Sequence, residues 1–528
     1  MTDIADYVII GAGSAGCVLA NRLSADPQRK VVLIEGGDED TSPLIHMPRG
    51  FGRMLGDPKF VWTYTAKRGG GANEPEYWVR GKTLGGSSSV NGMVYVRGQP
   101  SDYDSWAEAG CTGWGWADMA PCFRAIEDHE LGASENRGAG GALKITNHPR
   151  PTPLCDAVLS AAADLGVPIK DDLNTLDQEG VGYHQRSIWK GRRQSAAVAF
   201  LAPIRSRSNL RVLTNCIALG VVFERRRAIG VRVRAGGEEH VVLGREIILS
   251  CGALNSPQLL QLSGIGPADL LTRMGVAVVH DAPDVGANMR EHRLLSLQFR
   301  LSRGSENAQF QGLRLLGNAA KYGLLRRGPL ANAAFEVGGF IRADENAQRP
   351  DAQIMMGPFS LARGVERFAM EKEHGAICGG YVMRPESRGT VAISGPTVEA
   401  PLNIDPNYLS TDRDRRISAA IVRKIRAIFA NARMASFAPV ETSPGSAVQT
   451  DDEIVDAYHR LGASGYHAAG TCRMGADAQS VVDTSLRVRG VDGLRVVDIS
   501  IMPHLVSGNT NAPAMAIGWR AADLILKA

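Results

Sequence analysis

The stretch Tyr7-Val-Ile-Ile-Gly-Ala-Gly-Ser-Ala-Gly16 (YVIIGAGSAG, residues 7–16) decides the fold of this chain. Its first four residues form a fully apolar run, as in a buried parallel strand, and three glycines spaced as GxGxxG follow at once. Residues 17–23 then predict a helix, and the apolar run 31–34 predicts a second strand. That run ends in Glu35, which is placed to hydrogen-bond ribose hydroxyls, so the whole order is typical of a dinucleotide-binding fold.

The residues of this turn each have a physical role in such a fold. Gly11 permits the tight turn, Gly13 lets the backbone approach a pyrophosphate, and Gly16 lets the helix pack on the sheet. Ser14 and Ala15 lie in the same turn, just before the helix, whose free N–H groups and positive dipole end favour phosphates, so they are candidates for contact with the cofactor. The motif alone leaves NAD and FAD as alternatives.

Length and composition indicate an ordinary globular protein of two large domains that share a cleft. The chain has 528 residues, which is too long for one core. The net charge of +4, from 59 basic and 55 acidic residues, is too small to indicate a nucleic-acid partner or a membrane-bound protein. Eight scattered cysteines without a CxxC pair predict reduced thiols and no metal site.

No targeting or membrane-spanning segment is expected from the sequence. The chain opens MTDIADYVIIGAG, with acidic residues where a signal peptide carries basic ones. No run of about 18 apolar residues occurs, which argues against stable membrane insertion. We therefore expect a soluble, cytoplasmic protein.

A second glycine cluster lies in residues 80–92 (RGKTLGGSSSVNG). The small residues 85–89 allow a loop to run against a flat or charged ligand, with hydroxyl and N–H groups as donors. A flexible surface linker is the alternative. Residues 93–96 (MVYV) predict a buried strand directly afterwards, which favours the ligand loop.

At this point the sequence resembles the glucose–methanol–choline (GMC) oxidoreductase family. Five motifs carry the resemblance, and they occur in the family's order along nearly the whole chain. They are GKTLGGSSSVNGMVYVRGQPSDYD (81–104), GALNSPQLLQLSGIG (252–266), DVGANMREH (284–292), YHAAGTCRMG (466–475) and VVDISIMPHLVSGNTNAP (496–513).

The resemblance implies FAD rather than NAD, and an α/β fold of two domains. A Rossmann-like FAD-binding domain would be assembled from residues 1–155, 210–298 and 466–528. A substrate domain of the α+β type, with a mostly antiparallel sheet flanked by helices, would comprise residues 156–209 and 299–465.

The resemblance also implies which residues contact FAD. Asn91, Gly92 and Met93 would line the flavin ring, and Gly86 and Ser87 the pyrophosphate. Ala218 and Trp62 would lie at the adenine end, and Asp498 near the ribityl–pyrophosphate region. The remaining residues expected at the cofactor are Gly85, Val94, Ile499 and Thr510.

One departure from the family pattern concerns the link to the cofactor. Choline-oxidising members that hold FAD covalently carry a histidine just before the asparagine that corresponds to Asn91. Here Val90 stands at that position and cannot form the bond. We therefore expect non-covalent FAD.

Oxidation of an alcohol requires a base for the hydroxyl proton and an acceptor for the hydride. Imidazole suits the first task because its pKa lies near neutrality. By resemblance, His467 is the catalytic base beside flavin N5, and Asn511 fills the second catalytic position, where an amide would orient the substrate oxygen. Tyr466 is a candidate substrate-facing aromatic residue, whereas His292 is interpreted as structural.

The C-terminal residues 513–526 (PAMAIGWRAADLIL) predict a helix that begins with proline. By resemblance its N-terminus points at the flavin and stabilises the anionic reduced form.

The sequence thus predicts an FAD-dependent enzyme that oxidises a primary or secondary alcohol to an aldehyde or ketone. A non-redox lyase of the hydroxynitrile type, from the same family, is the alternative, and a redox-inactive binding protein is disfavoured by the full set of catalytic positions. The electron acceptor, oxygen or an electron carrier, stays open, as do the alcohol and the oligomeric state.

Overall fold

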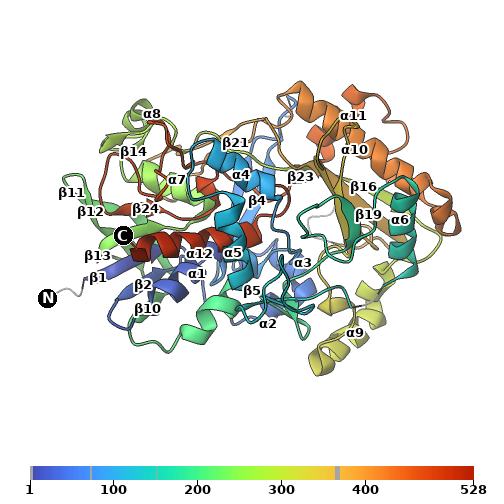
Figure 1. The fold of residues 1–528 in the computed structure, drawn as a ribbon, viewed down its shortest axis with the longest axis horizontal. Helices are drawn as coiled ribbons and strands as arrows, with labels where there is room; N and C mark the ends of the chain where they lie inside the picture. Colours follow the sequence, from blue (N-terminus) through green and yellow to red (C-terminus); the bar gives the residue numbers. More distant parts are fainter. Residues whose placement is uncertain (1–3, 72–73, 150, 363–368, 528) are drawn as a thin grey trace.

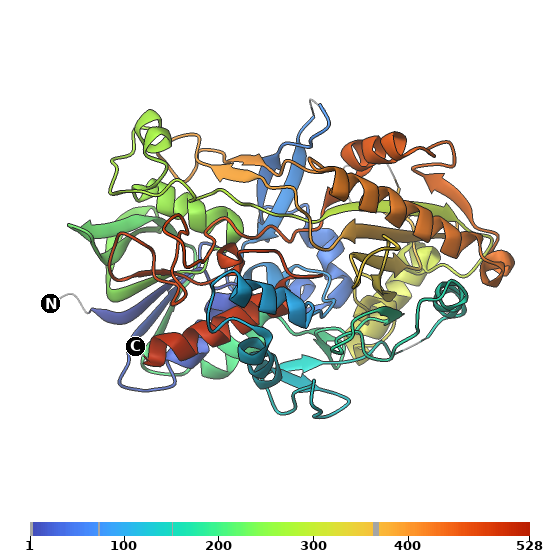
Figure 2. The same cartoon turned by 45° about the horizontal axis from the view of Figure 1, so that its top comes forward.

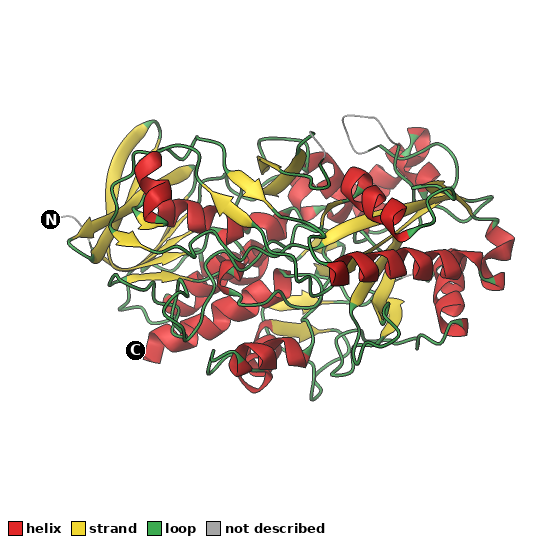
Figure 3. Ribbon diagram, turned by 90° about the horizontal axis from the view of Figure 1, so that it is seen from above, coloured by secondary structure: helices red, strands yellow, loops and turns green. Residues whose placement is uncertain are grey.

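The computed structural model describes residues 4–71, 74–149, 151–362 and 369–527. The molecule is elongated, and its two large sheets lie toward opposite ends (Figures 1 and 3). The first sheet is built from three distant parts of the chain, as the α/β prediction requires. This combination of a Rossmann-like part with a second, antiparallel part confirms the predicted fold class.

The first sheet has five parallel strands in the order β10-β2-β1-β13-β24. Their bounds are β10 Leu210–Leu213, β2 Val31–Ile34, β1 Ala5–Ile10, β13 Glu238–Leu249 and β24 Leu494–Val496. The long strand β13 also pairs antiparallel with β12 (Arg227–Ala235), which pairs with β11 (Cys216–Glu224). Helices α1 (Ser14–Leu23) and α12 (Asn511–Lys527) pack together beside this sheet (Figure 1).

The second sheet is antiparallel, in the order β17-β18-β19-β16-β22 with β23 also on β16. Its strands are β17 Val337–Ile341, β18 Ala352–Gly357, β19 Gly375–Val382, β16 Arg293–Arg300, β22 Val440–Ser443 and β23 Ala463–Ser464. Helix α10 (Asp412–Ala430) packs on β18 and β19, and α11 (Asp451–Leu461) lies beside it. Thr411 caps α10 by accepting a hydrogen bond from the backbone N–H of Asp414 at 3.2 Å.

Alternation along β16 separates the two faces of this sheet. Leu295, Leu297 and Phe299 are buried in the core that also contains residues of α10. The residues between them, Leu294, Ser296 and Gln298, point to the other face and line a large cavity. Because side chains alternate along the strand, one face of β16 packs in the core and the other lines the cavity.

A smaller sheet, β20-β21-β3-β4, lies between the two large ones (Figure 2). Its strands are β20 Thr390–Ala392, β21 Asn403–Asp405, β3 Val61–Ala66 and β4 Glu76–Gly81. It joins a segment that follows the first Rossmann strands to a segment from the second half of the chain. This places the glycine cluster after β4 next to the glycine-rich turn after β1.

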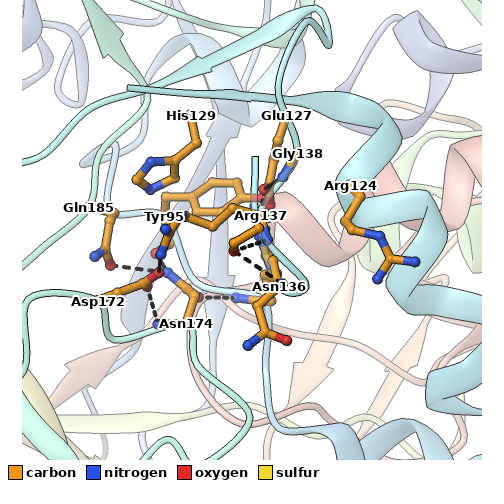
Figure 4. Close-up of polar contacts among 12 residues, drawn as sticks. Tyr95, Arg124, Glu127, His129, Asn136, Arg137, Gly138, Asp172, Asn174 and Gln185 are labelled. Carbon is orange, nitrogen blue, oxygen red and sulfur yellow. Dashed lines mark hydrogen bonds and ion pairs between the residues drawn. The ribbon is translucent and has the colours of Figure 1, made fainter. Parts of the chain in front are cut away.

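A buried polar network ties residues 127–138 to the loop 172–185 (Figure 4). Glu127 accepts a hydrogen bond from Arg97 Nε at 2.7 Å and also pairs with Tyr95. The Asn174 side-chain amide donates to the carbonyl oxygen of Tyr95 and to Gln185, both at 3.1 Å. These groups satisfy one another, so the network stabilises the chain that follows the second glycine cluster.

Some local predictions differ from the structure. Met93–Val96 is not a strand: Met93 has φ +63°, and only Val94 forms a single bridge, to Arg186. Strand β16 begins at Arg293, ahead of the expected domain boundary at residue 299.

Three absences concern the described part of the chain. No helix there is long and apolar enough to cross a bilayer. No cluster of three or more potential metal ligands occurs among those residues. All eight cysteines are free.

Candidate active site

A single cavity of about 1620 Å³ runs between the first and second sheets. Most residues that the sequence singled out line it, although they come from every part of the chain. They are Gly11, Gly13, Ser14, Ala15, Glu35, Trp62, Gly86, Ser87, Asn91, Gly92, Met93, Val94, Ala218, Tyr466, His467, Asp498, Ile499, Thr510 and Asn511. Gly16 and Gly85 lie behind this wall.

The two glycine-rich segments meet backbone to backbone. A Cβ atom on Gly86 would lie 2.8 Å from Gly13 Cα, and one on Gly16 would lie 1.9 Å from the carbonyl oxygen of Gly11. Gly11 itself has φ +100°, and a Cβ there would lie 2.4 Å from the carbonyl oxygen of Ser250. Side chains are therefore excluded from the place where α1 begins, which leaves its backbone N–H groups open to an anion.

Glu35 stands at the end of β2 with its carboxylate almost fully buried. It accepts hydrogen bonds from the backbone N–H groups of Ala12 at 3.0 Å and Gly37 at 2.9 Å. Burial raises the pKa of Glu35 to about 7, although these two bonds oppose the shift. The carboxylate thus holds the turns after β1 and β2 together while it lines the cavity.

Asn91 is held by a buried arginine that sequence reasoning missed. Arg193 Nη1 donates to the Asn91 carbonyl oxygen at 2.7 Å and to its side-chain oxygen at 2.8 Å. The backbone N–H of Met93 donates to the same side chain at 3.1 Å. Burial lowers the pKa of Arg193 to about 9, and its Nη2 has no acceptor among the described residues.

Asp498 follows β24 and holds the start of α7 (Gly252–Leu262). Its Oδ2 accepts from the backbone N–H of Gly252 at 2.9 Å and from the hydroxyl of Ser256 at 2.6 Å. Near Ala218, the Trp62 ring faces the ammonium group of Lys82 at 4.4 Å. The cavity wall that contains Asp498 and Trp62 is continuous and also includes residues of both glycine-rich segments.

Glu291 positions the backbone of His467. Its carboxylate accepts from the N–H groups of His467 and His292, both at 2.8 Å, and from the Ser464 hydroxyl at 2.9 Å. Desolvation raises the pKa of Glu291 to about 7 against the attraction of Arg80. Tyr466, with φ +63°, turns the chain so that the next residue faces inward.

The hydrogen bonds around the two histidines settle the tautomer of each ring. The Met383 carbonyl oxygen lies 2.7 Å from His292 Nε2 and can only accept, so that nitrogen carries the hydrogen. Burial lowers the pKa of His292 to about 3, so the ring is neutral and its Nδ1 is an acceptor. His467 Nδ1, 2.9 Å away, therefore donates to it. His467 Nε2 therefore carries no hydrogen, and its lone pair faces away from His292.

An amide lies directly against that lone pair. Asn509 Nδ2 is 3.2 Å from His467 Nε2, and Asn509 Oδ1 accepts from Gln353 Nε2 at 3.1 Å. Gln353 in turn accepts from the hydroxyl of Tyr381, whose ring stacks on His292 with centroids 4.4 Å apart. These partners orient the amide so that its N–H group faces the imidazole.

Asn511, which the resemblance puts at the second catalytic position, does not hydrogen-bond to His467 through its side chain. Asn511 is the first residue of α12, and its side-chain oxygen accepts from the Ser14 hydroxyl at 2.8 Å. The turn before the helix directs this side chain to the glycine-rich turn and directs Asn509 to the histidine. Both amides line the cavity, but only Asn509 contacts the imidazole.

The electrostatic surroundings keep His467 neutral. Desolvation lowers its pKa well below the ordinary value, and His292 and Arg80 lower it further. The ring is therefore an unprotonated acceptor at neutral pH, aimed into a cavity.

Comparison with known proteins agrees with this geometry. The N-terminal family model of the GMC oxidoreductases matches residues 5–294, and the C-terminal one matches residues 385–518. The chain belongs to the GMC oxidoreductase family. The predicted family is thus confirmed.

Three proteins illustrate the relationship of this GMC oxidoreductase to others. An alcohol dehydrogenase (acceptor) from Pseudomonas putida is 41% identical over 99% of this chain and 96% of its own length. The crystal structure of pyridoxine 4-oxidase from Mesorbium loti has a TM-score of 0.90 and 34% identity, and 99% of each chain is covered. Human mitochondrial choline dehydrogenase is 41% identical over 98% of this chain and 89% of its own length.

This GMC oxidoreductase is an FAD-dependent enzyme that oxidises alcohols, as the sequence predicted. The residues present fit FAD. A Cβ atom on Gly13 would meet nothing closer than the Ser250 carbonyl oxygen at 3.9 Å, so this cavity-lining glycine leaves open space beside the start of α1 that a side chain would fill.

Sequence reasoning missed three residues of this site. Arg193 lies outside the family motifs, so no signal was available for it. Asn509 lies two positions before Asn511 in the same motif. Because α12 begins at Asn511, the two side chains point in different directions. His292 was interpreted as structural. Its motif, residues 284–292, did contain a signal, because His292 is the sole histidine there and directly follows the acid Glu291.

Proposed function

We propose that this enzyme oxidises an uncharged, largely apolar alcohol, with His467 Nε2 as the general base and Asn509 as the group that orients the hydroxyl. The observation that supports the proposal is the unprotonated Nε2, which accepts the Asn509 amide N–H at 3.2 Å at the wall of the cavity. A substrate hydroxyl that takes the place of this hydrogen bond would donate its hydrogen to Nε2 and accept the amide N–H.

The hydroxyl proton of the alcohol moves to His467 Nε2 while the hydride leaves the carbon that bears the hydroxyl. FAD, when bound, supplies the acceptor for that hydride. The imidazolium that forms on His467 keeps its Nδ1–H bond to His292, whose neutral ring accepts it and stays anchored to the Met383 carbonyl. Burial of the pair excludes water, which strengthens these hydrogen bonds.

Residues from both glycine-rich segments would hold FAD. The pyrophosphate would lie at the start of α1, against Gly11, Gly13, Ser14, Ala15 and Gly86. Glu35 would bind a ribose, Ala218 and Trp62 the adenine end, and Asn91, Gly92 and Met93 the flavin end. Val90 is buried among Ile45, Met54, Phe60 and Val61 and has no atom to bond to the cofactor, which supports non-covalent FAD.

The charge of the substrate-side wall supports an uncharged substrate. None of the described residues between 294 and 377 that line the cavity carries a charge. Most of them are apolar, including Leu294, Phe335, Met355, Phe359 and Ile377. A quaternary ammonium group would need an acidic or aromatic cage to replace its hydration.

The aromatic faces in this wall are already next to a cation. The guanidinium group of Arg49 lies 5.2 Å from the ring centroid of Phe310 and 5.1 Å from that of Phe359. Glu336 pairs with Arg49 at 2.5 Å and Glu306 lies 3.7 Å from it, so the arginine is neutralised where it lines the cavity. The faces of Phe310 and Phe359 are already next to this cation and are not free to form a cage for choline, which disfavours choline as the substrate.

The electrons then pass to oxygen or to an electron carrier. Eight free cysteines support a reducing compartment such as the cytoplasm for this reaction. The relatives named above are dehydrogenases and oxidases, which favours oxidation over the lyase alternative.

A matched pair of substrates tests the proposal. Choline and 3,3-dimethylbutan-1-ol have the same shape and differ only in charge. We expect the neutral alcohol to bleach the flavin absorbance anaerobically with a kcat/KM about 100-fold higher than choline. Equal rates, or a preference for choline, would contradict the uncharged-substrate assignment, and no bleaching by any alcohol would contradict oxidation itself. Admission of air afterwards distinguishes oxygen from a carrier.

A further inference from the structure

Helix α9 (Gly312–Leu325) presents apolar side chains to the outside of the molecule. None of its residues is buried, and it lies at the lower edge of the second part (Figure 1). Leu315, Asn318 and Tyr322, at helical spacing, are its half-buried stripe toward the protein. On the opposite side, Leu313 and Leu324 are 85% and 84% exposed, with Leu316 at 65%. Exposed leucines on one helix face mark an interaction surface.

The segment around this helix is exclusively basic. Residues 307–335 contain Arg314, Lys321, Arg326 and Arg327 and no aspartate or glutamate. This stretch therefore carries a charge of +4, as large as the net charge of the whole chain. The small overall charge thus conceals a local positive patch on a helix with an apolar outer face.

An aromatic residue extends the same surface. The turn between β8 (Ile188–Trp189) and β9 (Arg192–Arg193) packs on the end of α9, where Tyr322 donates to the Gly191 carbonyl oxygen at 3.0 Å. Trp189 is 38% exposed, and the ammonium groups of Lys190 and Lys144 lie 5.7 and 5.8 Å from its ring. Tryptophan flanked by lysine is typical of the interface between lipid and water.

The same helix borders the substrate cavity. Leu315, Leu316 and Ala319 line it, so the apolar outer face and the cavity wall share Leu316. Whatever covers the outer face therefore lies at the entrance to the active-site cavity.

We propose that α9 and the Trp189 turn form a docking surface for an anionic lipid bilayer. The leucines would enter the acyl boundary while Arg314, Lys321, Arg326 and Arg327 contact acidic headgroups, as in amphipathic helices that lie in the plane of a membrane. Such docking needs no membrane-spanning helix. A second copy of the chain fits this face less well, because two faces of charge +4 would repel each other.

Vesicle co-sedimentation of the FAD-loaded full chain tests this surface. We expect binding to vesicles of phosphatidylcholine with 30% phosphatidylglycerol, weak binding to pure phosphatidylcholine, and release by 0.5 M NaCl because salt screens the headgroup contacts. The variant Leu313→Glu/Leu324→Glu should lower the bound fraction about tenfold. Val241→Glu/Val278→Glu, on half-exposed valines of the first part, is the matched control and should bind as the wild type does.

Folding and site integrity are checked by flavin content and by turnover of a water-soluble alcohol without vesicles, which both variants should retain. Absence of vesicle binding by the wild type, or undiminished binding by the leucine variant, would overturn the proposal. A change from dimer to monomer in the leucine variant without lipid would also overturn it, because a second copy would then cover α9. None of these results depends on the identity of the alcohol, so failure here and failure of the proposed function are distinguishable.

Discussion

His292 Nδ1 accepts a hydrogen bond from His467 Nδ1 across 2.9 Å, and this contact connects the proposed general base to the second sheet. The direction follows from the Met383 carbonyl, which binds the only hydrogen that a neutral His292 carries. His467 Nε2 is therefore unprotonated before any substrate arrives, and it accepts the Asn509 amide N–H. His292 acts through His467 and is a positioning residue.

Replacement of His292 should separate its hydrogen-bonding role from its bulk. His292→Leu removes the acceptor, so we expect kcat to fall about 10- to 100-fold, equivalent to a lost bond of about 1.5–3 kcal/mol. His292→Gln offers an oxygen acceptor and should recover much of the loss. Flavin content and KM serve as controls. If both variants lose activity equally, packing rather than the tautomer explains the effect.

Flavin reduction should not slow down between pH 8 and 6, as it would if the base were a histidine with an ordinary pKa. The base must be neutral, and desolvation lowers the pKa of His467 well below the usual range. Activity is therefore lost only when the pH falls through that lowered pKa, and kcat/KM should stay level between pH 8 and 6. An ordinary histidine of pKa about 6.5 would already lose about three-quarters of its neutral form at pH 6. Stopped-flow reduction with a neutral alcohol measures this, and such a loss at pH 6 would refute the assignment.

Removal of the base itself should be far more severe. His467→Gln should lower the reduction rate by about 10²- to 10⁴-fold while FAD stays bound, because general-base catalysis contributes that much. The flavin spectrum of the variant reports cofactor retention. A variant that reduces its flavin at the wild-type rate would exclude His467 as the base.

Asn509 and Asn511 should give opposite results although they lie two residues apart. Asn509→Ala removes the amide that faces Nε2, so kcat/KM should fall about tenfold or more with little change in FAD affinity. Asn511→Ala removes the acceptor of the Ser14 hydroxyl and should weaken FAD more than it slows reduction. Cofactor titration and reduction rates on both variants test this. A larger rate loss for Asn511→Ala would instead support Asn511 as the second catalytic residue, as the resemblance implies.

Glu35→Gln should weaken cofactor binding. The carboxylate accepts from two backbone N–H groups, and a glutamine places an NH₂ group against one of them. We expect FAD to dissociate about tenfold more readily, a loss of about 1–3 kcal/mol. The exposed Glu238→Gln is the matched control, and fluorescence titration of the apoprotein is the measurement. Equal affinity of both variants would show that Glu35 does not shape the site.

Much of the fold was predictable because the hydrophobic pattern of a segment agrees with the place that the segment takes in the folded protein. Val31–Ile34 forms β2 with the predicted bounds, and the helix predicted after the glycines is α1. The prediction of a strand at Met93–Val96 was wrong because burial alone suggested it. A ligand-facing loop is buried as well, and Met93 has a positive φ that no strand permits.

Side-chain direction at the site was less predictable than the identity of the motif. His467 lines the cavity as expected, but whether Asn509 or Asn511 faces it depends on where α12 begins. The pairing of His292 with His467 joins residues 175 positions apart, which lie next to the paired strands β16 and β23 of one sheet. Nothing in the spacing along the chain reports such a contact.

The carbonyl of Met383 gives the proton arrangement an unusual tolerance to mutation. Every amino acid carries that oxygen, so substitution at position 383 can change packing without deleting the acceptor. Selection for a competent base therefore acts on His292 and on the path of the chain after β19. Side chains on the face of that sheet that lines the cavity can then vary. Related enzymes could therefore keep the His467–His292 pair and act on different alcohols.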